Sequence, residues 1–319
     1  MRSPRYAKRR DQGETLPSLI SYIRDVFGKL DENHFKVLKV IERNLTRYEI
    51  VPREVIYDES GLGERAEKLL KKLNEYKLIW APMGYEKGFC INYYGLDMLA
   101  LKALVDRNII ASLGRPLGVG KEADVYDALA PDGRRLVAKF FRIGRTSFRK
   151  YERHRTSLLT APSYLAASIK SAKMEYRALR ILHPARVRVP KPVARNRHVV
   201  VTEFFQGIEL AIAQSLSKPL EILGEIFRNA AMAWEAGVVH SDLSAYNILI
   251  TPEEEILIID WPQWVPPSHP MAREYLKRDL SNLIKFFRRR WHIGEIPREY
   301  LDLVGKICGE SLFNAIKRP

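Results

Sequence analysis

The sequence has few cysteines, no long apolar run and no excess of acidic residues. Its two cysteines, Cys90 and Cys308, lie far apart, so neither a disulfide framework nor a cysteine metal site is indicated, and a reducing compartment is expected. The apolar runs are shorter than the roughly 20 residues that cross a bilayer, and none follows the basic N-terminus as in a secretory signal. We therefore expect a soluble, cytoplasmic protein without a membrane partner.

Positive charge is abundant: 53 Lys and Arg residues face 38 Asp and Glu residues, which gives a formal net charge of +15. Such an excess favours a polyanionic partner, most often nucleic acid. A basic surface that is merely well solvated would have the same composition. Hydrophobic residues make up 46% of the 319 residues, enough for buried cores in about two domains.

The first part of the chain predicts a helical domain behind a basic arm. Asp31 is a plausible N-cap for one helix, and a second could begin near Pro52. A third helix has an apolar stripe, with Arg65, Lys68 and Lys72 on the opposite face, and a hairpin pattern follows in KLIWAPMGYEKGFCINYY. This order is typical of a winged helix-turn-helix that binds nucleic acid; a small bundle with a solvated basic face is the alternative.

The strongest chemical signal is HSDLSAYN at residues 240–247, followed by two apolar runs that end at Asp260. Asn247 stands five positions after Asp242 and thirteen before Asp260, which leaves room for a hairpin that returns Asp260 beside Asn247. Kinase-like enzymes need one acid that orients the attacking hydroxyl, and an amide and a second acid that hold Mg²⁺. The spacing therefore predicts a phosphoryl-transfer site, although each residue alone would more often be a cap or turn residue.

A glycine-rich segment precedes these residues. Two glycines at the tip of a hairpin let the backbone approach phosphates closely. The Walker A spacing is absent, and an ordinary turn would explain the segment if it stood alone. Its partners downstream make it a candidate phosphate-binding loop, formed by Gly118, Val119, Gly120, Lys121, Glu122, Ala123, Asp124 and Val125.

Lys139 lies in the apolar run LVAKFF, where its ammonium group needs an anion or must reach solvent. Glu175 is its natural partner, because its spacing from Ala172 and Leu179 places it near the packed face of a predicted helix. Such a pair positions the α- and β-phosphates of ATP. An exposed helical glutamate is the alternative.

A buried strand is predicted at VVVTEFF, residues 199–205. In a kinase-like fold such a strand leads into the hinge, where backbone groups pair with adenine. The Glu203 carbonyl and the Phe205 amide are the candidates for these contacts. A core strand that leads into a surface loop would have the same residues.

Together, GVGKEADVY, HSDLSAYN and IIDWPQWV resemble the RIO family of atypical protein kinases. The N-terminal domain and the run IDWPQ…SHP…A…Y..RD are similar to its RIO2 branch, and the resemblance covers nearly the whole chain. It implies ATP with Mg²⁺, or Mn²⁺ in its place, and a role in maturing the small ribosomal subunit. It also implies Ser/Thr kinase activity, or an ATPase cycle through an aspartyl-phosphate on Asp260. The lack of a long C-terminal extension favours an archaeal source.

The resemblance assigns roles to single residues. It makes Asp242 the catalytic acid, Asn247 and Asp260 the Mg²⁺ ligands, and Lys139 the phosphate clamp with Glu175 as its partner. His-Ser-Asp replaces the His-Arg-Asp of ordinary protein kinases, Trp-Pro follows Asp260, and no Ala-Pro-Glu segment is present. These departures put the phosphorylation of ordinary proteins in doubt, because a docking platform for peptides is missing.

The expected fold class is therefore α+β: an N-terminal winged helix-turn-helix domain followed by a reduced bilobal protein-kinase-like fold. We expect the N-terminal domain and the basic segment at 145–162 to dock on a pre-ribosomal small subunit, through its RNA. The expected division is a winged-helix domain with its arm at 1–95, a linker helix at 96–114, an N-lobe at 115–206 and a C-lobe at 207–319.

Two other functions remain open from the sequence. Small-molecule phosphotransferases share the His-x-Asp-Leu-x-x-x-Asn loop, but Lys121, Glu122, Ser244 and the N-terminal domain argue against them. A nucleic-acid-binding scaffold with an inactive kinase fold is the non-enzymatic alternative. It is disfavoured because every acid that Mg·ATP would need is present. The sequence leaves the phosphate acceptor and the oligomeric state open.

Overall fold

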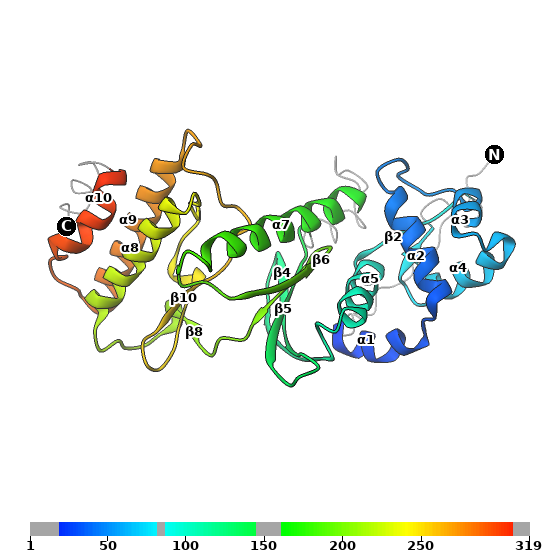
Figure 1. The fold of residues 1–319 in the computed structure, drawn as a ribbon, viewed down its shortest axis with the longest axis horizontal. Coiled ribbons are helices and arrows are strands. Elements are labelled where there is room, and N and C mark those ends of the chain that lie inside the picture. Colours follow the sequence, from blue (N-terminus) through cyan, green and yellow to red (C-terminus); the bar gives the residue numbers. More distant parts are fainter. Residues whose placement is uncertain (1–18, 82–86, 145–160, 309–319) are drawn as a thin grey trace, which may run out of the picture.

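A computed structural model describes residues 19–81, 87–144 and 161–308 of the chain. Figure 1 shows three parts in a row: a helical N-terminal part, a central sheet with one long helix, and a second, mainly helical part. This confirms the predicted fold class. The N-terminal arm and most of the basic 145–162 segment lie outside the described residues.

The N-terminal part contains the expected order of helices and a strand pair. Asp31 caps one helix through a capping box with His34, which satisfies backbone N–H groups that the first turn leaves unpaired. The strands pair antiparallel, with Ile79 opposite Ile91; the tip between them, residues 82–86, lies outside the described residues. The elements are α1 (Leu19–Val26), η1 (Phe27–Lys29), α2 (Glu32–Asn44), α3 (Arg53–Ser60), η2 (Gly63–Arg65), α4 (Ala66–Glu75), β1 (Ile79–Trp80) and β2 (Cys90–Ile91).

Helix α5 (Tyr93–Asp106) belongs to two hydrophobic cores at once. Leu96 and Leu99 pack in the core of the N-terminal part, whereas Leu101 and Leu104 pack in the core beneath the central sheet. A helix that is apolar on most of its circumference is buried on most of it. The predicted linker helix therefore also binds the two parts together.

The central sheet has five antiparallel strands in the order β3-β4-β5-β7-β6. Its strands are β3 (Ser112–Val119), β4 (Ala123–Leu129), β5 (Arg135–Phe141), β6 (Pro192–Asn196) and β7 (Val199–Glu203). Buried side chains alternate along β4 and β5, and all but Asp124 of them are apolar, the pattern of strands with one face on a core.

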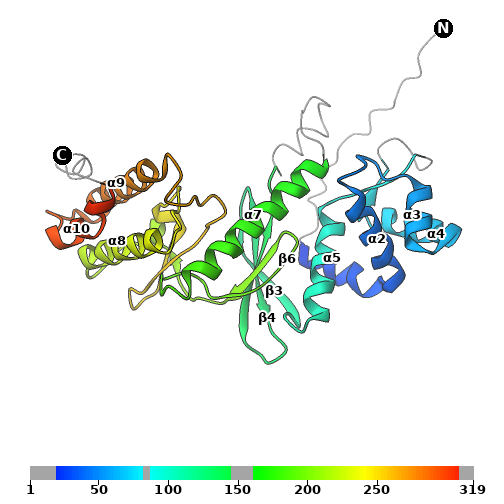
Figure 2. The same ribbon diagram turned by 45° about the horizontal axis from the view of Figure 1, so that its top comes forward.

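The long helix α7 (Ala161–Leu182) touches all three parts of the fold (Figures 1 and 2). Near its start, Leu165 joins the core of the N-terminal part. Farther along, Ala172, Leu179 and Leu182 join the core of the C-terminal part. The position of this helix therefore depends on both ends of the molecule.

The C-terminal part combines three helices with a small antiparallel sheet in the order β10-β9-β8. Its core includes Trp261, Leu280 and Phe287, all of them almost fully buried. No helix in the described residues is both long and apolar enough to cross a membrane. The elements are β8 (Ile208–Glu209), η3 (Leu210–Ile212), α8 (Pro219–Glu235), η4 (Ala245–Asn247), β9 (Ile248–Ile250), β10 (Ile256–Ile258), α9 (Ala272–Trp291) and α10 (Arg298–Cys308).

Candidate active site

The short β9–β10 hairpin brings Asp260 beside Asn247, as the sequence spacing suggests. Ile248 stands opposite Ile258 in the ladder, and Ile259 N–H donates to the Asn247 carbonyl at 2.9 Å. The side-chain Nδ2 of Asn247 donates to the Asp242 carbonyl at 2.8 Å. The three positions that carry the main chemical prediction therefore lie next to one another.

Lys139 joins the N-lobe to this hairpin. Its Nζ lies 2.6 Å from Glu175 Oε2 on α7 and 2.8 Å from Asp260 Oδ1. Glu175 also accepts a hydrogen bond from the backbone N–H of Trp261. The strand, the helix and the segment after β10 thus meet at one ammonium group.

Charge and burial set the ionisation of these groups. Burial alone would lower the pKa of Lys139, but Glu175 and Asp260 together raise it. Lys139 is the main cause that lowers the pKa of Asp260, whose side chain is 46% exposed. Burial raises the pKa of Glu175, and Lys139 opposes that rise. The site therefore presents an ionised, accessible carboxylate beside a fixed cation.

Asp279, on α9, anchors the loop that carries Asp242. Its carboxylate is 2% exposed, and its Oδ2 accepts the backbone N–H of Leu243 at 2.9 Å. Arg278 donates to the other carboxylate oxygen at 2.8 Å and to the Ser241 carbonyl. Arg278 and Asp279 form the Arg-Asp that ends the motif run similar to the RIO2 branch, but the sequence alone did not predict that they bind the catalytic loop.

Two residues of the site have left-handed backbone geometry. Ser241 has φ of +66° and Asp260 has φ of +70°. This region costs a non-glycine residue about 1–3 kcal/mol and is often found at active sites. Hydrogen bonds on both sides hold it here: Ser241 Oγ donates to the Gln263 carbonyl at 2.8 Å, and Lys139 binds Asp260.

His240 packs the catalytic loop against the segment that follows β10. Its ring lies 4.5 Å from the Trp261 ring, between centroids, and its Nε2 lies 3.0 Å from the Ile259 carbonyl. Burial lowers the pKa of His240, so the neutral ring donates from Nε2. His240, two residues before Asp242, therefore holds both neighbours of Asp260, and so helps to set the position of Asp260 relative to Asp242.

The glycine-rich segment spans the end of β3, the turn at residues 120–122 and the start of β4, so only Gly120 of the two glycines lies in the turn, where its N–H donates to the Ala123 carbonyl at 2.8 Å. Gly118, Val119, Lys121 and Glu122 are exposed along it. Farther along β4, Val125 stands opposite Lys139 in the ladder, so the segment leads directly to the ammonium group.

Asp124 has a place that the sequence did not suggest. Its carboxylate is buried and accepts from Arg142 Nε at 3.2 Å, and Arg142 N–H donates to the Glu122 carbonyl at 2.6 Å. Arg142 therefore anchors the base of the glycine-rich turn through both backbone and side chain. Contact of this turn with phosphates stays a prediction.

The candidate hinge follows β7. Glu203 ends the strand, and Phe204 N–H donates to the Arg135 carbonyl at 3.2 Å. The Arg135 guanidinium lies 3.7 Å from the centre of the Phe204 ring. Adenine contacts by the Glu203 carbonyl and the Phe205 amide remain a prediction.

The donor set suits a metal ion that arrives with a nucleotide. Within the described residues, no group of three or more His, Cys, Asp or Glu side chains could hold a metal ion. Asn247 donates its amide nitrogen to the Asp242 carbonyl, which leaves its amide oxygen free to bind a metal ion, and the backbone bond from Ile259 to Asn247 keeps Asp260 near it in the chain. Mg²⁺ typically takes one or two carboxylates and completes its shell with phosphates and water. The two side chains fit that pattern.

Comparison with known proteins adds the family. A RIO domain matches residues 124–299, and a Rio2 N-terminal domain matches residues 27–107. The RIO-type serine/threonine-protein kinase Rio2 of Methanocaldococcus jannaschii is 36% identical over 253 residues, covering 77% of this chain and 92% of that protein. Serine/threonine-protein kinase rio2 of Schizosaccharomyces pombe is 30% identical over 273 residues, covering 84% of this chain and 79% of that protein.

Among solved structures, the Rio2 kinase–ADP/Mg²⁺–phosphoaspartate complex from Chaetomium thermophilum has a TM-score of 0.77 and 28% identity, covering 92% of each chain. The Rio2 kinase from the same organism, in a second structure, has a TM-score of 0.73 and 29% identity. The N-terminal part and the kinase-like part thus both have counterparts in one group of enzymes. The chain belongs to the RIO family of atypical serine/threonine-protein kinases and, within it, to the Rio2 type.

Proposed function

We propose that this enzyme binds Mg·ATP at Lys139 and Asp260, with the nucleotide phosphates on the lysine and the metal ion on the aspartate, and acts in maturation of the small ribosomal subunit. The observation that carries the proposal is the single ammonium group that joins Glu175 at 2.6 Å and Asp260 at 2.8 Å. Kinase-like enzymes use this lysine–glutamate pair for phosphates and this acid for the metal.

Each residue contributes one task in this proposal. Lys139 binds the α- and β-phosphates, and Glu175 keeps the lysine side chain extended toward them. Asn247 and Asp260 hold Mg²⁺, which neutralises phosphate charge when it is bound. Asp242 orients the attacking hydroxyl in the transfer reaction.

Hydrolysis through Asp260 is the alternative use of the same site. The Asp260 carboxylate is exposed and its pKa is lowered, so it is ionised and able to attack. A carboxylate oxygen would bond to the γ-phosphorus while the bond to the ADP oxygen breaks. Water would then attack that phosphorus and release phosphate, restoring the carboxylate. The phosphoaspartate in the Chaetomium thermophilum complex supports this order of events.

Turnover of ATP tests the proposal directly. Wild type, Asp242→Asn and Asp260→Asn would be assayed with and without small ribosomal subunits, with Asp302→Asn on α10 as a matched control. Transfer predicts labelled protein that depends on Asp242; hydrolysis predicts free phosphate and an acyl-phosphate that depends on Asp260. Unchanged turnover in all the variants would instead identify the chain as a scaffold.

We propose that the N-terminal part binds ribosomal RNA of a cytoplasmic pre-ribosomal particle through α4. Lys68 and Lys72 are exposed along this helix and Arg65 is exposed just before it, and the chain carries a net charge of +15. Each phosphate contact contributes about 0.7–0.9 to the slope of log affinity against log salt. Loss of three contacts should therefore reduce that slope by about 2–3.

The RNA test compares two triple variants with the same change in net charge, using a fragment of small-subunit RNA and fluorescence anisotropy. The α4 variant should lose affinity and slope, and the variant of the C-terminal part should not. Equal losses would point to general charge attraction and refute a specific role for α4. The variants are Arg65→Gln, Lys68→Gln and Lys72→Gln on or beside α4, and Lys218→Gln, Arg228→Gln and Lys306→Gln in the C-terminal part.

A further inference from the structure

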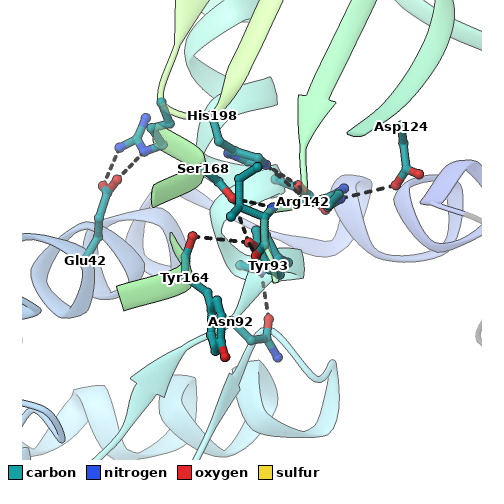
Figure 3. A network of polar contacts seen from close by, with 12 residues as sticks. Glu42, Asn92, Tyr93, Asp124, Arg142, Tyr164, Ser168 and His198 are labelled. Atoms are coloured by element: carbon teal, nitrogen blue, oxygen red, sulfur yellow. Dashed lines mark hydrogen bonds and ion pairs between the residues drawn. The ribbon is translucent and has the colours of Figure 1, made fainter. Parts of the chain in front are cut away.

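One tyrosine at the start of α5, Tyr93, contacts helix α7, which carries Glu175, and the segment that follows strand β5, which carries Lys139 (Figure 3). The hydroxyl of Tyr93 lies 2.8 Å from the Ile143 carbonyl and 2.7 Å from Ser168 Oγ. A third contact, to the Tyr164 carbonyl, is longer at 3.3 Å. Ile143 N–H donates to Ser168 Oγ at 2.9 Å.

These contacts define a closed ring of donors and acceptors. Because Ser168 Oγ accepts from Ile143 N–H, its own proton is available for Tyr93 Oη. The Tyr93 proton then goes to its shorter carbonyl contact, that of Ile143. Each of the three residues thus donates to the next, so loss of any one of them removes two of the three hydrogen bonds.

The ring ties the same two elements that meet at the ATP site. Ile143 lies four residues after Lys139, just past the end of β5. Ser168 lies seven residues before Glu175 on α7, two helical turns or about 10 Å away. The spacing between β5 and α7 is therefore fixed at two points. One is the Lys139–Glu175 ion pair, and the other is the ring of hydrogen bonds around Tyr93 of α5.

Helix α5 holds the end of β5 by a second side chain one turn farther along. Asp97 binds Arg142 in a bidentate pair, at 2.7 and 2.9 Å, and the Arg142 guanidinium lies 5.2 Å from the Tyr93 ring centre. Tyr93 and Asp97 thus grip two consecutive residues, Ile143 and Arg142. Movement of α5 relative to the sheet would carry this end of β5 with it.

We propose that Tyr93 is a positioning residue, through which α5 of the N-terminal part sets the geometry of the Lys139–Glu175 pair and so its grip on nucleotide phosphates. This rests on the proposed Mg·ATP function of that pair. The proposal assigns Tyr93 to phosphate binding alone, because its ring of hydrogen bonds touches neither the candidate hinge nor the Asp242 loop.

The test is affinity for two ligands that differ in their phosphates. Calorimetry would measure the dissociation constants of Mg·ADP and of adenosine for the full chain. Tyr93→Phe keeps the aromatic ring and removes only the hydroxyl, and loss of one such bond should weaken Mg·ADP about fivefold to tenfold. Adenosine affinity should stay within about twofold, since its contacts do not involve Lys139.

Two further variants make the result decisive. Ser168→Ala breaks the ring from the α7 side and should reproduce the selective loss, with no additional loss in the double variant. Tyr22→Phe is the matched control: its hydroxyl also bonds a backbone carbonyl, that of Tyr76, inside the N-terminal part. It should lower thermal stability and leave both affinities unchanged.

The outcomes separate the two proposals. Wild type that fails to bind Mg·ADP would refute the function, whatever Tyr93 does. Wild type that binds, with Tyr93→Phe and Ser168→Ala equal to it, would refute the positioning role alone. Parallel losses for adenosine and Mg·ADP would also refute it, because they would show general loosening of the site.

Discussion

Asp97 is a fully buried carboxylate whose removal should destabilise the fold strongly. Its carboxylate is 0% exposed, and it accepts from Arg142 at 2.7 and 2.9 Å and lies 2.8 Å from His198 Nε2. The substitution Asp97→Asn keeps the size and shape of the side chain. It replaces one acceptor oxygen by an NH₂ group that faces donors, and it leaves Arg142 with Asp124 as its remaining carboxylate within the cluster.

The magnitude follows from burial. Removing one partner of a buried ion pair costs about 3–5 kcal/mol, because the other charge stays buried without compensation. With an unfolding entropy of about 2.1 cal/mol/K per residue over 319 residues, this corresponds to a fall in melting temperature of roughly 4–7 °C. A part of the chain that unfolded separately would show a larger shift, because its entropy is smaller.

Differential scanning calorimetry at neutral pH gives the measurement, with Asp106→Asn as the control. Asp106 lies on the same helix and pairs with Lys102 at 2.6 Å, but its side chain is half exposed, so its loss should matter little. Equal shifts for the two variants would refute the reasoning that burial determines the cost.

Acid should reduce the difference between wild type and Asp97→Asn. Burial alone would raise the pKa of Asp97, but Arg142 and His198 hold it below its ordinary value. A carboxylate with a lowered pKa stabilises the fold above its unfolded pKa of about 4 and loses that contribution as pH falls through the folded value. The gap in melting temperature should therefore be constant near neutrality and shrink below about pH 4.

Three further predictions concern the site and its connection to the N-terminal part. Lys139→Met should lower kcat/KM for ATP at least about 100-fold. It should also move the acid limb of Mg·ADP binding to higher pH, because Lys139 is the main cause of the low pKa of Asp260. A pH series of calorimetric titrations measures the second effect. Asp279→Asn should lower kcat about tenfold and leave Mg·ADP affinity unchanged in steady-state and binding assays, since it frees the catalytic loop only. Glu42→Gln and Arg197→Gln should show a coupling of about 1 kcal/mol in a double-mutant cycle of unfolding. The reason is that Glu42 and Arg197 form a bidentate ion pair, with both distances 2.6 Å, and that both side chains are about four-fifths buried. Additive effects of the two substitutions would contradict this prediction.

The sequence was enough to predict the residues that are joined by local chain geometry. Asp242, Asn247 and Asp260 lie on one loop and one hairpin, so their spacing alone brought them together. Lys139 and Glu175 were predicted as partners because each is a charge in an apolar pattern, and a buried charge needs an opposite one.

The residues that the sequence did not reveal depend on contacts between distant segments. Arg142 meets Asp97, 45 residues away, and Asp97 meets His198, 101 residues away. No periodicity connects such positions, and each residue alone reads as an ordinary surface charge. Asp279 was missed for the same reason, since its role depends on how α9 packs under the catalytic loop.

The double burial of α5 has a consequence for how this protein can be divided. A catalytic fragment that begins after the strand pair would expose Leu96 and Leu99 to solvent. A catalytic fragment that begins after α5 would lack Leu101 and Leu104, which cover the sheet. Neither fragment keeps a closed apolar interior, and each uncovered leucine forfeits about 1.5–3 kcal/mol. The N-terminal domain of this enzyme is therefore not a separable folding unit, because the catalytic part needs α5 for its own stability.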